Sequence, residues 1–357
     1  MSVTAKELAE KLHLSPAAVS MALNSKPGVS TETRSRVLDA AAQYGYDMSR
    51  ISAKKRSSKD ICFLIYKKYG TIVTETAFFT ELFEGVTDAC REIGYRVNTQ
   101  YIYDNESSPS SAAAGSGVLR GTSADVPGDA LARQLDALPL NNCAGIILLA
   151  TEMTADRYPL FASLPVPVVL LDTYFENITA DYVLINNVQG AYLAASYLIR
   201  RTKKQPGYLQ SSYPIGNFRE RANGFYNAVR AGGMSASRCI VHRLSPSVEG
   251  AFADMMELLE NGEETAPCYF ADNDLIAVGA MKALKAKGYR IPEDISIAGF
   301  DNISYGHVLE PSLTTIHVPK KEMGRTAVLR LREILEFSHT VPLKIEISTK
   351  LIKRKSA

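Results

Sequence analysis

Apolar and polar positions follow two different patterns on either side of residue 60. Before it, apolar residues recur three and four positions apart in short segments, which predicts small helices. After it, apolar runs of strand length alternate with amphipathic segments, which predicts parallel sheets covered by helices on both faces. The expected strands are Ile61–Tyr66, Arg96–Tyr103, 145–150, 167–171, 206–210, 239–242, 267–271 and 294–299. The expected helices are Thr80–Ile93, 129–138, 188–201, 218–231, 248–261, 274–288 and 321–336.

The first 46 residues carry a series of helix-start signals. Thr4, Ser15 and Ser30 are good N-caps, and Glu7 completes a capping box with Thr4. Two short helices across a tight turn, supported by a third, are typical of a helix-turn-helix that binds DNA. The alternative is a generic small helical bundle. The predicted helices are Ala5–Leu12, a second beginning at Pro16, and Thr31–Tyr44 with Gly45 as its C-cap.

Composition indicates a soluble protein of two or three domains. The chain has 357 residues, of which 46% are hydrophobic and 22% charged. No run of 18 apolar residues predicts a membrane span, and the polar N-terminus does not resemble a secretory signal. Five cysteines without CxxC spacing predict buried, reduced thiols and a cytoplasmic location. They are Cys62, Cys90, Cys143, Cys239 and Cys268.

Charge is unevenly distributed. Residues 1–59 hold ten basic and five acidic residues, a net charge of +5, whereas the whole chain has a net charge of only +2. A small basic module joined to a slightly acidic body favours nucleic-acid binding, although basic termini are often merely solvated.

With the helix pattern added, the N-terminal segment resembles the head of the LacI/GalR family of bacterial repressors. The resemblance rests on TAKELAEKLHLSPAAVSMALN and VSTETRSRVLDAAAQYGY. It implies that the second helix enters the major groove of double-stranded operator DNA. Where Met21 stands the family usually has a polar base reader, so base contacts here must be largely apolar, for example with thymine methyl groups. The resemblance implies base contacts from Pro16, Ala17 and Met21, and phosphate contacts from Ser15, Ser20 and Asn24.

The linker, residues 47–59, departs from that family. Met48 replaces the usual proline, and Lys55 falls where a leucine is expected to wedge into the minor groove. A basic hinge cannot act as an apolar wedge, but it can neutralise phosphates. We therefore expect Lys54, Lys55 and Arg56 to contact the DNA backbone.

The sequence offers no catalytic or cofactor signature. There is no GxSxG, P-loop or HExxH motif, and the five histidines have no spacing that suggests a metal site. Residues 105–128 are rich in Ser, Ala, Gly and Pro and predict a flexible surface insertion. We therefore expect neither an enzyme nor a bound cofactor.

The body also resembles the LacI/GalR family, through residues 269–317, 76–95 and 351–356. The resemblance implies two lobes like those of periplasmic sugar-binding proteins, with a small ligand between them and crossovers near residues 185, 318 and 343. The implied division is a head at 1–46, a hinge at 47–59, and a body at 60–357 for effector binding and dimerisation. Its N-terminal lobe would hold about 60–185 and 318–343, and its C-terminal lobe about 186–317 and 344–357.

Five residues at strand ends or helix starts are candidates for effector binding. In open α/β sheets ligands lie at the carboxyl ends of strands. Carboxylates accept hydroxyl protons, a guanidinium donates to them, and an aromatic ring covers apolar C–H edges. Structural roles are also open: Asp172 as a cap, Phe79 in the core, or Arg221 at the surface. The candidates are Phe79, Asp172, Arg221, Asn273 and Asp301, and all five match effector-contacting positions of the family.

These inferences predict a homodimeric, ligand-responsive repressor that binds a pseudo-palindromic operator and responds to a sugar or sugar-like effector. Alternatives are a sugar-binding protein without a DNA role, a regulator with a nucleobase or phosphorylated effector, and an α/β enzyme.

Overall fold

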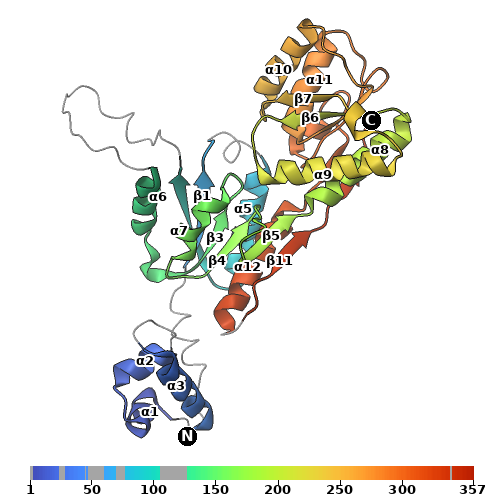
Figure 1. Cartoon of the computed structure of the whole chain (residues 1–357). Coiled ribbons are helices and arrows are strands. Elements are labelled where there is room, and N and C mark those ends of the chain that lie inside the picture. The colour runs from blue at the N-terminus through green and yellow to red at the C-terminus, as the bar shows by residue number, and fades with distance from the viewer. Residues whose placement is uncertain are drawn as a thin grey trace, which may run out of the picture.

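A computed structural model of the chain describes residues 3–23, 29–44, 46, 60–69, 77–104, 127–337 and 340–357. The predicted hinge, residues 47–59, and most of the predicted insertion lie outside this described part. The described elements form three helices at the N-terminus and a body of parallel sheets and helices (Figure 1). This arrangement agrees with the α/β fold and all-α head expected from the sequence.

The head contains α1 (Ala5–Leu12), α2 (Pro16–Leu23) and α3 (Thr31–Gln43). The capping box predicted at Thr4 is present, and the side-chain oxygens of Ser15 and Ser30 each accept a backbone N–H at the start of the next helix. Tyr44 is the C-cap of α3, and the predicted cap Gly45 lies outside the described residues. The buried core of the head consists of Leu8, Ala9, Val19, Ala22, Leu23, Val37, Ala40 and Ala41.

The N-terminal lobe is built on a six-stranded parallel sheet in the order β11-β5-β4-β3-β1-β2. Alternate residues of β1 face opposite sides: Ile61 and Phe63 pack with α5 and α12, whereas Leu64 packs with α6 and α7. The strands are β1 (Asp60–Lys67), β2 (Arg96–Tyr103), β3 (Cys143–Leu149), β4 (Val168–Leu171), β5 (Asp181–Ile185) and β11 (Lys344–Ile347). The helices are α5 (Ala77–Glu92), α6 (Pro127–Asp136), α7 (Tyr158–Ala162) and α12 (Lys320–Glu336).

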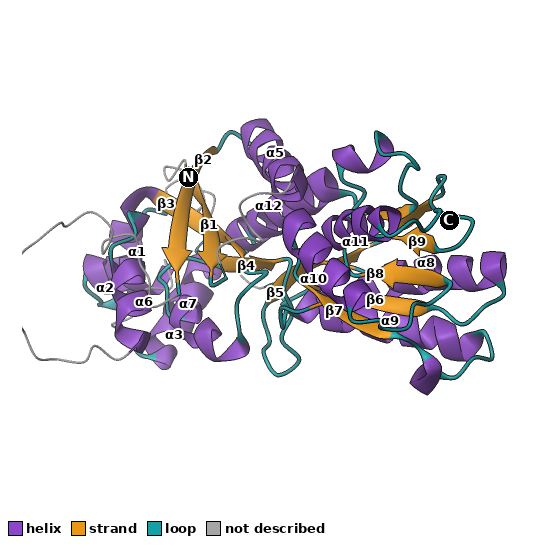
Figure 2. Ribbon diagram, turned by 90° about the horizontal axis from the view of Figure 1, so that it is seen from above, coloured by secondary structure: helices purple, strands orange, loops and turns teal. Residues whose placement is uncertain are grey.

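The C-terminal lobe is built on a four-stranded parallel sheet in the order β7-β6-β8-β9. In Figure 2 the strands of the two lobes form separate groups along the body. The helices of the C-terminal lobe cover both faces of its sheet, with α8 and α9 on one face and α10 and α11 on the other. The strands are β6 (Gly207–Ser211), β7 (Val241–Leu244), β8 (Cys268–Ala271) and β9 (Ser296–Ala298); the helices are α8 (Asn187–Thr202), α9 (Gly216–Ala231), α10 (Val248–Glu260) and α11 (Asp274–Ala286). Short 3-10 helices span Leu140–Asn142, Ala155–Arg157, Ala236–Arg238 and Ser304–His307.

The chain passes between the lobes three times, and the last crossing corrects the predicted boundary. The first two crossings follow β5 and β10 (Thr315–His317), close to the expected residues 185 and 318. The third was expected near 343, but β11 (Lys344–Ile347) still pairs with β5 in the N-terminal lobe. The crossing therefore follows residue 347. The next strand, β12 (Lys350–Ile352), pairs antiparallel with β10.

Two glycines bring α5 and α12 into direct contact. A side-chain carbon on Gly85 would lie 2.0 Å from the backbone oxygen of Lys321, and one on Gly324 would lie 2.3 Å from that of Leu82. Only glycine permits backbones to approach this closely. The contact fixes α5, whose first turn reaches the site described next.

Candidate functional site

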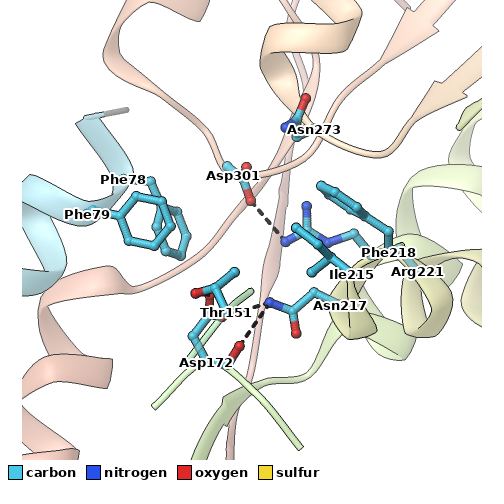
Figure 3. Close-up of a pocket in the computed structure, with 10 residues that line it drawn as sticks. All are labelled: Phe78, Phe79, Thr151, Asp172, Ile215, Asn217, Phe218, Arg221, Asn273 and Asp301. Carbon is cyan, nitrogen blue, oxygen red and sulfur yellow. Dashed lines mark hydrogen bonds and ion pairs between the residues drawn. The ribbon is translucent and has the colours of Figure 1, made fainter. Parts of the chain in front are cut away.

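A small cavity lies between the two lobes, at the carboxyl ends of their strands. Its volume is about 40 Å³. Both lobes contribute to it: the loops after β3 and β4 and the start of α5 on one side, and α9 with the loops after β8 and β9 on the other (Figure 3). The lining residues are Phe78, Phe79, Thr151, Asp172, Ile215, Asn217, Phe218, Arg221, Asn273 and Asp301.

Arg221 is the centre of the C-terminal wall. Its side chain projects from α9, is 4% exposed, and stacks on the ring of Phe300 at 3.8 Å from the ring centroid. Nε donates to Oδ1 of Asn187 at 2.9 Å, and Nη1 donates to the backbone oxygen of Asp272 at 2.5 Å. Arg221 is therefore a buried, fixed cation and not the surface residue that the sequence left possible.

Asp301 forms an ion pair with that cation. Nη2 of Arg221 lies 3.2 Å from Oδ1 of Asp301, and a dashed line marks this ion pair in Figure 3. Oδ1 is buried yet has no aligned hydrogen-bond donor, so it keeps an unused acceptor position. Burial raises the pKa of Asp301, although Arg221 opposes the shift. Its φ of 103° lies in the left-handed region, an uncommon conformation that often marks functional positions.

Asp172 is the carboxylate of the N-terminal wall. It follows β4 directly, has a φ of 64°, and is 2% exposed. One oxygen accepts the hydroxyl proton of Thr151 at 2.7 Å, and the other accepts the side-chain amide of Asn217 at 3.0 Å. Burial raises the pKa of Asp172 to about 6, despite these hydrogen bonds. Because Asn217 belongs to α9, this contact joins the two lobes.

Aromatic and aliphatic side chains form the remaining walls. Phe78 and Phe79 stand at the start of α5, edge to face, with ring centroids 5.0 Å apart and planes inclined by 72°. Opposite them, Ile215 and Phe218 project from the start of α9. Phe79 also packs against the core. It is therefore both a core residue and a residue that lines the cavity.

Asn273 is both a helix cap and a lining residue. Its side-chain oxygen accepts the backbone N–H of Ile276 at 2.9 Å and caps α11. Its amide nitrogen has no hydrogen-bond partner among the described residues. The structure thus brings all five candidate residues to one cavity.

The sequence analysis missed five of the lining residues. Three of them, Ile215, Asn217 and Phe218, lie at the start of α9, after the loop that follows β6, where an open α/β sheet places ligand contacts. Their position in the sequence, between a predicted strand and the next predicted helix, could have identified them as lining residues. Phe78 and Thr151 adjoin recognisable elements, but their orientation depends on packing between distant segments.

The exposed face of α2 carries most of the residues expected to contact DNA. Ser15, Pro16, Ala17 and Ser20 are exposed and Met21 is partly exposed, whereas the opposite face of α2 is buried in the head. Asn24, Lys54, Lys55 and Arg56 lie outside the described residues. The position of this face agrees with a helix that enters a groove.

Comparisons with known proteins extend over the whole chain. Residues 195–357 match the periplasmic binding protein-like domain family. The HTH-type transcriptional repressors PurR of Mannheimia succiniciproducens and Pasteurella multocida are 28% and 29% identical, over 99% of this chain and 98% of theirs. A CelR–cellobiose complex has a TM-score of 0.70 at 22% identity, covering 99% of this chain and 100% of that one. A lac repressor dimer bound to operator has a TM-score of 0.67 at 21% identity, covering 100% and 99%.

The structure combines a two-lobed α/β body, which includes a periplasmic binding protein-like domain, with a helix-turn-helix head. The end-to-end similarity places it more narrowly. Over its whole length the chain resembles transcriptional repressors of the LacI/GalR type, the PurR proteins and the lac repressor among them.

No described helix is both long enough and apolar enough to cross a membrane. The described His, Cys, Asp and Glu side chains form no group of three that could hold a metal ion. Four of the five cysteines are buried and Cys239 is partly exposed, all as free thiols.

Proposed function

We propose that this protein is a transcriptional repressor that binds operator DNA as a homodimer and is controlled by a neutral, polyhydroxylated effector, a sugar or close analogue, in the cavity between its lobes. The heads would bind two half-sites, and the effector would shift the lobes and so change operator affinity. The PurR repressors are similar to this chain over 98% of their length. Their similarity supports the proposal that this protein regulates transcription.

The DNA-binding part of the proposal assigns α2 to the major groove. Pro16, Ala17 and Met21 would contact base edges, and Ser15 and Ser20 would contact phosphates. The apolar character of these base contacts fits thymine methyl groups better than guanine edges. Asn24 and the basic hinge residues Lys54, Lys55 and Arg56 would add phosphate contacts.

The observation that carries the effector class is the buried Arg221–Asp301 pair beside three phenylalanine rings. A carboxylate oxygen without a donor accepts a hydroxyl proton, and the free amide nitrogen of Asn273 donates to a hydroxyl oxygen. Phenylalanine rings cover the C–H faces of a sugar. Acceptors, donors and apolar faces in one small space match a polyol.

Charge disfavours a phosphorylated effector. Among the described residues that line the cavity, Arg221 is the single cation, and its donors already serve Asn187, Asp272 and Asp301. Asp172 and Asp301 add negative charge. A phosphate would therefore face two carboxylates without a cation of its own.

A nucleobase is the second candidate, because three phenylalanine rings line the cavity. Stacking on a flat base needs a ring face parallel to it. Phe78 and Phe79 instead meet edge to face. At most one of these two rings can therefore lie parallel to a bound base, and the preference for a sugar rests on the polar groups of Arg221, Asp301 and Asn273.

The test is an electrophoretic mobility shift of the full-length protein on operator fragments selected from genomic DNA. We expect a shift with a dimer on each site, and a change in affinity on addition of one sugar from a panel. A change caused only by nucleobases would move the assignment to the second candidate. Absence of any shift on selected DNA would refute the regulatory proposal.

A further inference from the structure

Asn302 directly follows Asp301, the carboxylate of the C-terminal wall, but does not itself line the cavity. Both residues have a backbone in the left-handed region, with φ of 103° at Asp301 and 51° at Asn302. Residues other than glycine adopt this conformation rarely, although asparagine tolerates it better than most. Two such residues in succession persist only where the surrounding contacts hold them. The contacts of Asn302 therefore help to determine where Asp301 points.

The side chain of Asn302 connects this loop to two crossings between the lobes. Nη2 of Arg354 donates to Oδ1 of Asn302 at 2.7 Å, and the amide nitrogen of Asn302 donates to Nδ1 of His317 at 3.2 Å. His317 ends β10, just before the second crossing, and Arg354 follows β12, just after the third. Because β10 and β12 pair with each other, one side chain contacts the chain beside both crossings.

The backbone of the loop is fixed to β10 as well. The N–H of Asn302 donates to the hydroxyl oxygen of Thr315 at 3.3 Å, and that hydroxyl donates to the carboxylate of Asp274 at 2.6 Å. The other oxygen of Asp274 accepts the N–H of Ile303 at 2.9 Å. Asp274 is fully buried, so loss of either bond would leave a buried carboxylate oxygen unsatisfied. The loop and β10 are therefore expected to move together.

Lys320 extends these contacts to the other lobe. Its Nζ donates to the backbone oxygen of Asn302 at 3.4 Å and forms an ion pair with Glu81 of α5 at 3.5 Å. Lys320 begins α12 and is 1% exposed, so its ammonium group depends on these partners for the hydration that it has lost. Burial raises the pKa of Asp301, and Arg221 and Lys320 both oppose that shift. Contacts thus run from Asp301 through Asn302 and Lys320 to α5.

We infer that Asn302 is a positioning residue that holds Asp301 toward Arg221 and couples effector binding at Asp301 to movement of the lobes about the second and third crossings. Lobes of this kind move as bodies about the few residues that join them, so a displacement of Asp301 that reaches those residues changes the angle between the lobes. The inference rests on the proposed effector site at Asp301. It adds a residue outside the cavity that transmits occupancy of that site.

Three substitutions separate this role from a purely structural one. Asn302→Gly keeps the left-handed backbone without strain and removes the amide. Asn302→Asp keeps an acceptor for Arg354, and its second oxygen can accept the Nδ1 proton of the other neutral tautomer of His317. Lys203→Gly is the matched control, because Lys203 also has a left-handed backbone, with φ of 55°, but is exposed at the C-cap of α8.

The first experiment measures operator affinity of the full-length protein by fluorescence anisotropy, without sugar and with a saturating sugar. The sugar is the one among ribose, glucose, galactose and cellobiose that gives the largest thermal shift. We expect the sugar to change operator affinity about 5–150-fold in the unmodified protein and in Lys203→Gly, but less than about twofold in Asn302→Gly. Asn302→Asp should restore most of the change, and operator affinity without sugar should be the same in all four proteins.

A full response of Asn302→Gly at saturating sugar would overturn the inference, even if its sugar affinity were lower, because Asn302 would then position Asp301 without coupling it to the crossings. Failure of Asn302→Asp to restore the response would overturn it too. If none of the four sugars binds, the proposed sugar effector is refuted, and the second experiment decides the inference without any sugar.

The second experiment follows hydrogen exchange in the sugar-free, full-length protein by mass spectrometry. Asp301→Ala should increase exchange severalfold in segments 315–320 and 350–354 where Asn302 is present. In the Asn302→Gly background the same substitution should cause no further increase, because the connection to both crossings is already broken. Exchange in α10, which lies on the other face of the sheet, should stay unchanged and serves as the internal reference. Equal increases in both backgrounds, or no increase in either, would overturn the inference.

Discussion

The two walls of the cavity are built in different ways. On the C-terminal wall Arg221 is already fixed by Asn187, the backbone of Asp272, and Asp301, all residues of the same lobe or its crossover. On the N-terminal wall two phenylalanines stand beside a single carboxylate, Asp172. One oxygen of that carboxylate is satisfied across the cleft, by an amide of the other lobe.

This difference suggests that the C-terminal wall recognises the ligand, whereas the N-terminal wall affects the closure of the two lobes. A wall whose polar groups are fixed within one lobe presents the same surface whether the lobes are open or closed, so it determines which ligand binds. A carboxylate that bonds across the cleft contributes only when the lobes approach, so it affects the equilibrium between open and closed forms. Variants of the C-terminal wall should therefore have the larger effects.

The largest effect is expected for Arg221→Ala. It leaves the buried Asp301 carboxylate without its cation, and breaking a buried pair in this way costs about 3–5 kcal/mol. Effector response should be lost, and the melting temperature should fall by roughly 5–15 °C in calorimetry. Arg230→Ala is the control, because Arg230 is exposed on the same helix and contacts Asn227. A melting temperature and response like those of the unmodified protein would refute the assigned role of the C-terminal wall.

Asp301→Ala should have the next largest effect. Arg221 keeps its bonds to Asn187 and Asp272, so the fold should lose less stability than with Arg221→Ala. Loss of a charge-assisted bond to a ligand hydroxyl costs about 1.5–3 kcal/mol, or one to two decades in affinity. The effector-induced thermal shift should disappear while operator binding remains. An unchanged shift would remove Asp301 from the site.

The pH dependence of stability should distinguish the lobes. Burial raises the pKa values of Asp272 and Asp274, in the C-terminal lobe, to about 7 and that of Asp172 to about 6. A carboxyl with a raised pKa binds protons more tightly in the folded state, so its contribution to the free energy of unfolding falls as pH rises from the ordinary pKa of 3.8 to the raised one.

We therefore expect Asp272→Asn and Asp274→Asn to flatten the decrease in stability between about pH 4 and 7, and Asp172→Asn to flatten it only up to about pH 6. Denaturant unfolding at a series of pH values measures the free energy of unfolding of each protein. Comparison with the unmodified protein cancels the contributions of His242 and His317, whose pKa values burial lowers. Equal slopes in all four proteins would contradict the difference between the lobes.

The smallest effect is expected from shortening the predicted insertion, residues 105–128. Replacement of residues 105–126 by a short Gly-Ser link leaves α6 complete from Pro127. Closure entropy changes slowly with loop length, so the melting temperature and effector affinity should barely change. A decrease of several degrees, or loss of the dimer, would show that this segment packs against the protein.

Much of the fold could be predicted from the sequence, because caps and apolar runs depend on residues that are close together in the chain. Ser15 and Ser30 cap helices within three residues of themselves, and the apolar strands β1 and β3 are almost wholly buried. The strands missed from the sequence, β5, β10, β11 and β12, have three to five residues each. Of these β11 and β12 are only partly buried, so they lack a continuous apolar run.

The sequence by itself determined the head, the alternation of strands and helices, and the polar residues that follow β4, β8 and β9, because each depends on near neighbours or on the edge of a parallel sheet. Tertiary structure decided what those residues contact. Asn217 meets Asp172 across 45 positions, and Arg221 meets the backbone of Asp272 across 51. Such pairs form only when three crossings of the chain bring two lobes together, and no local pattern of residues encodes which side chains then face each other.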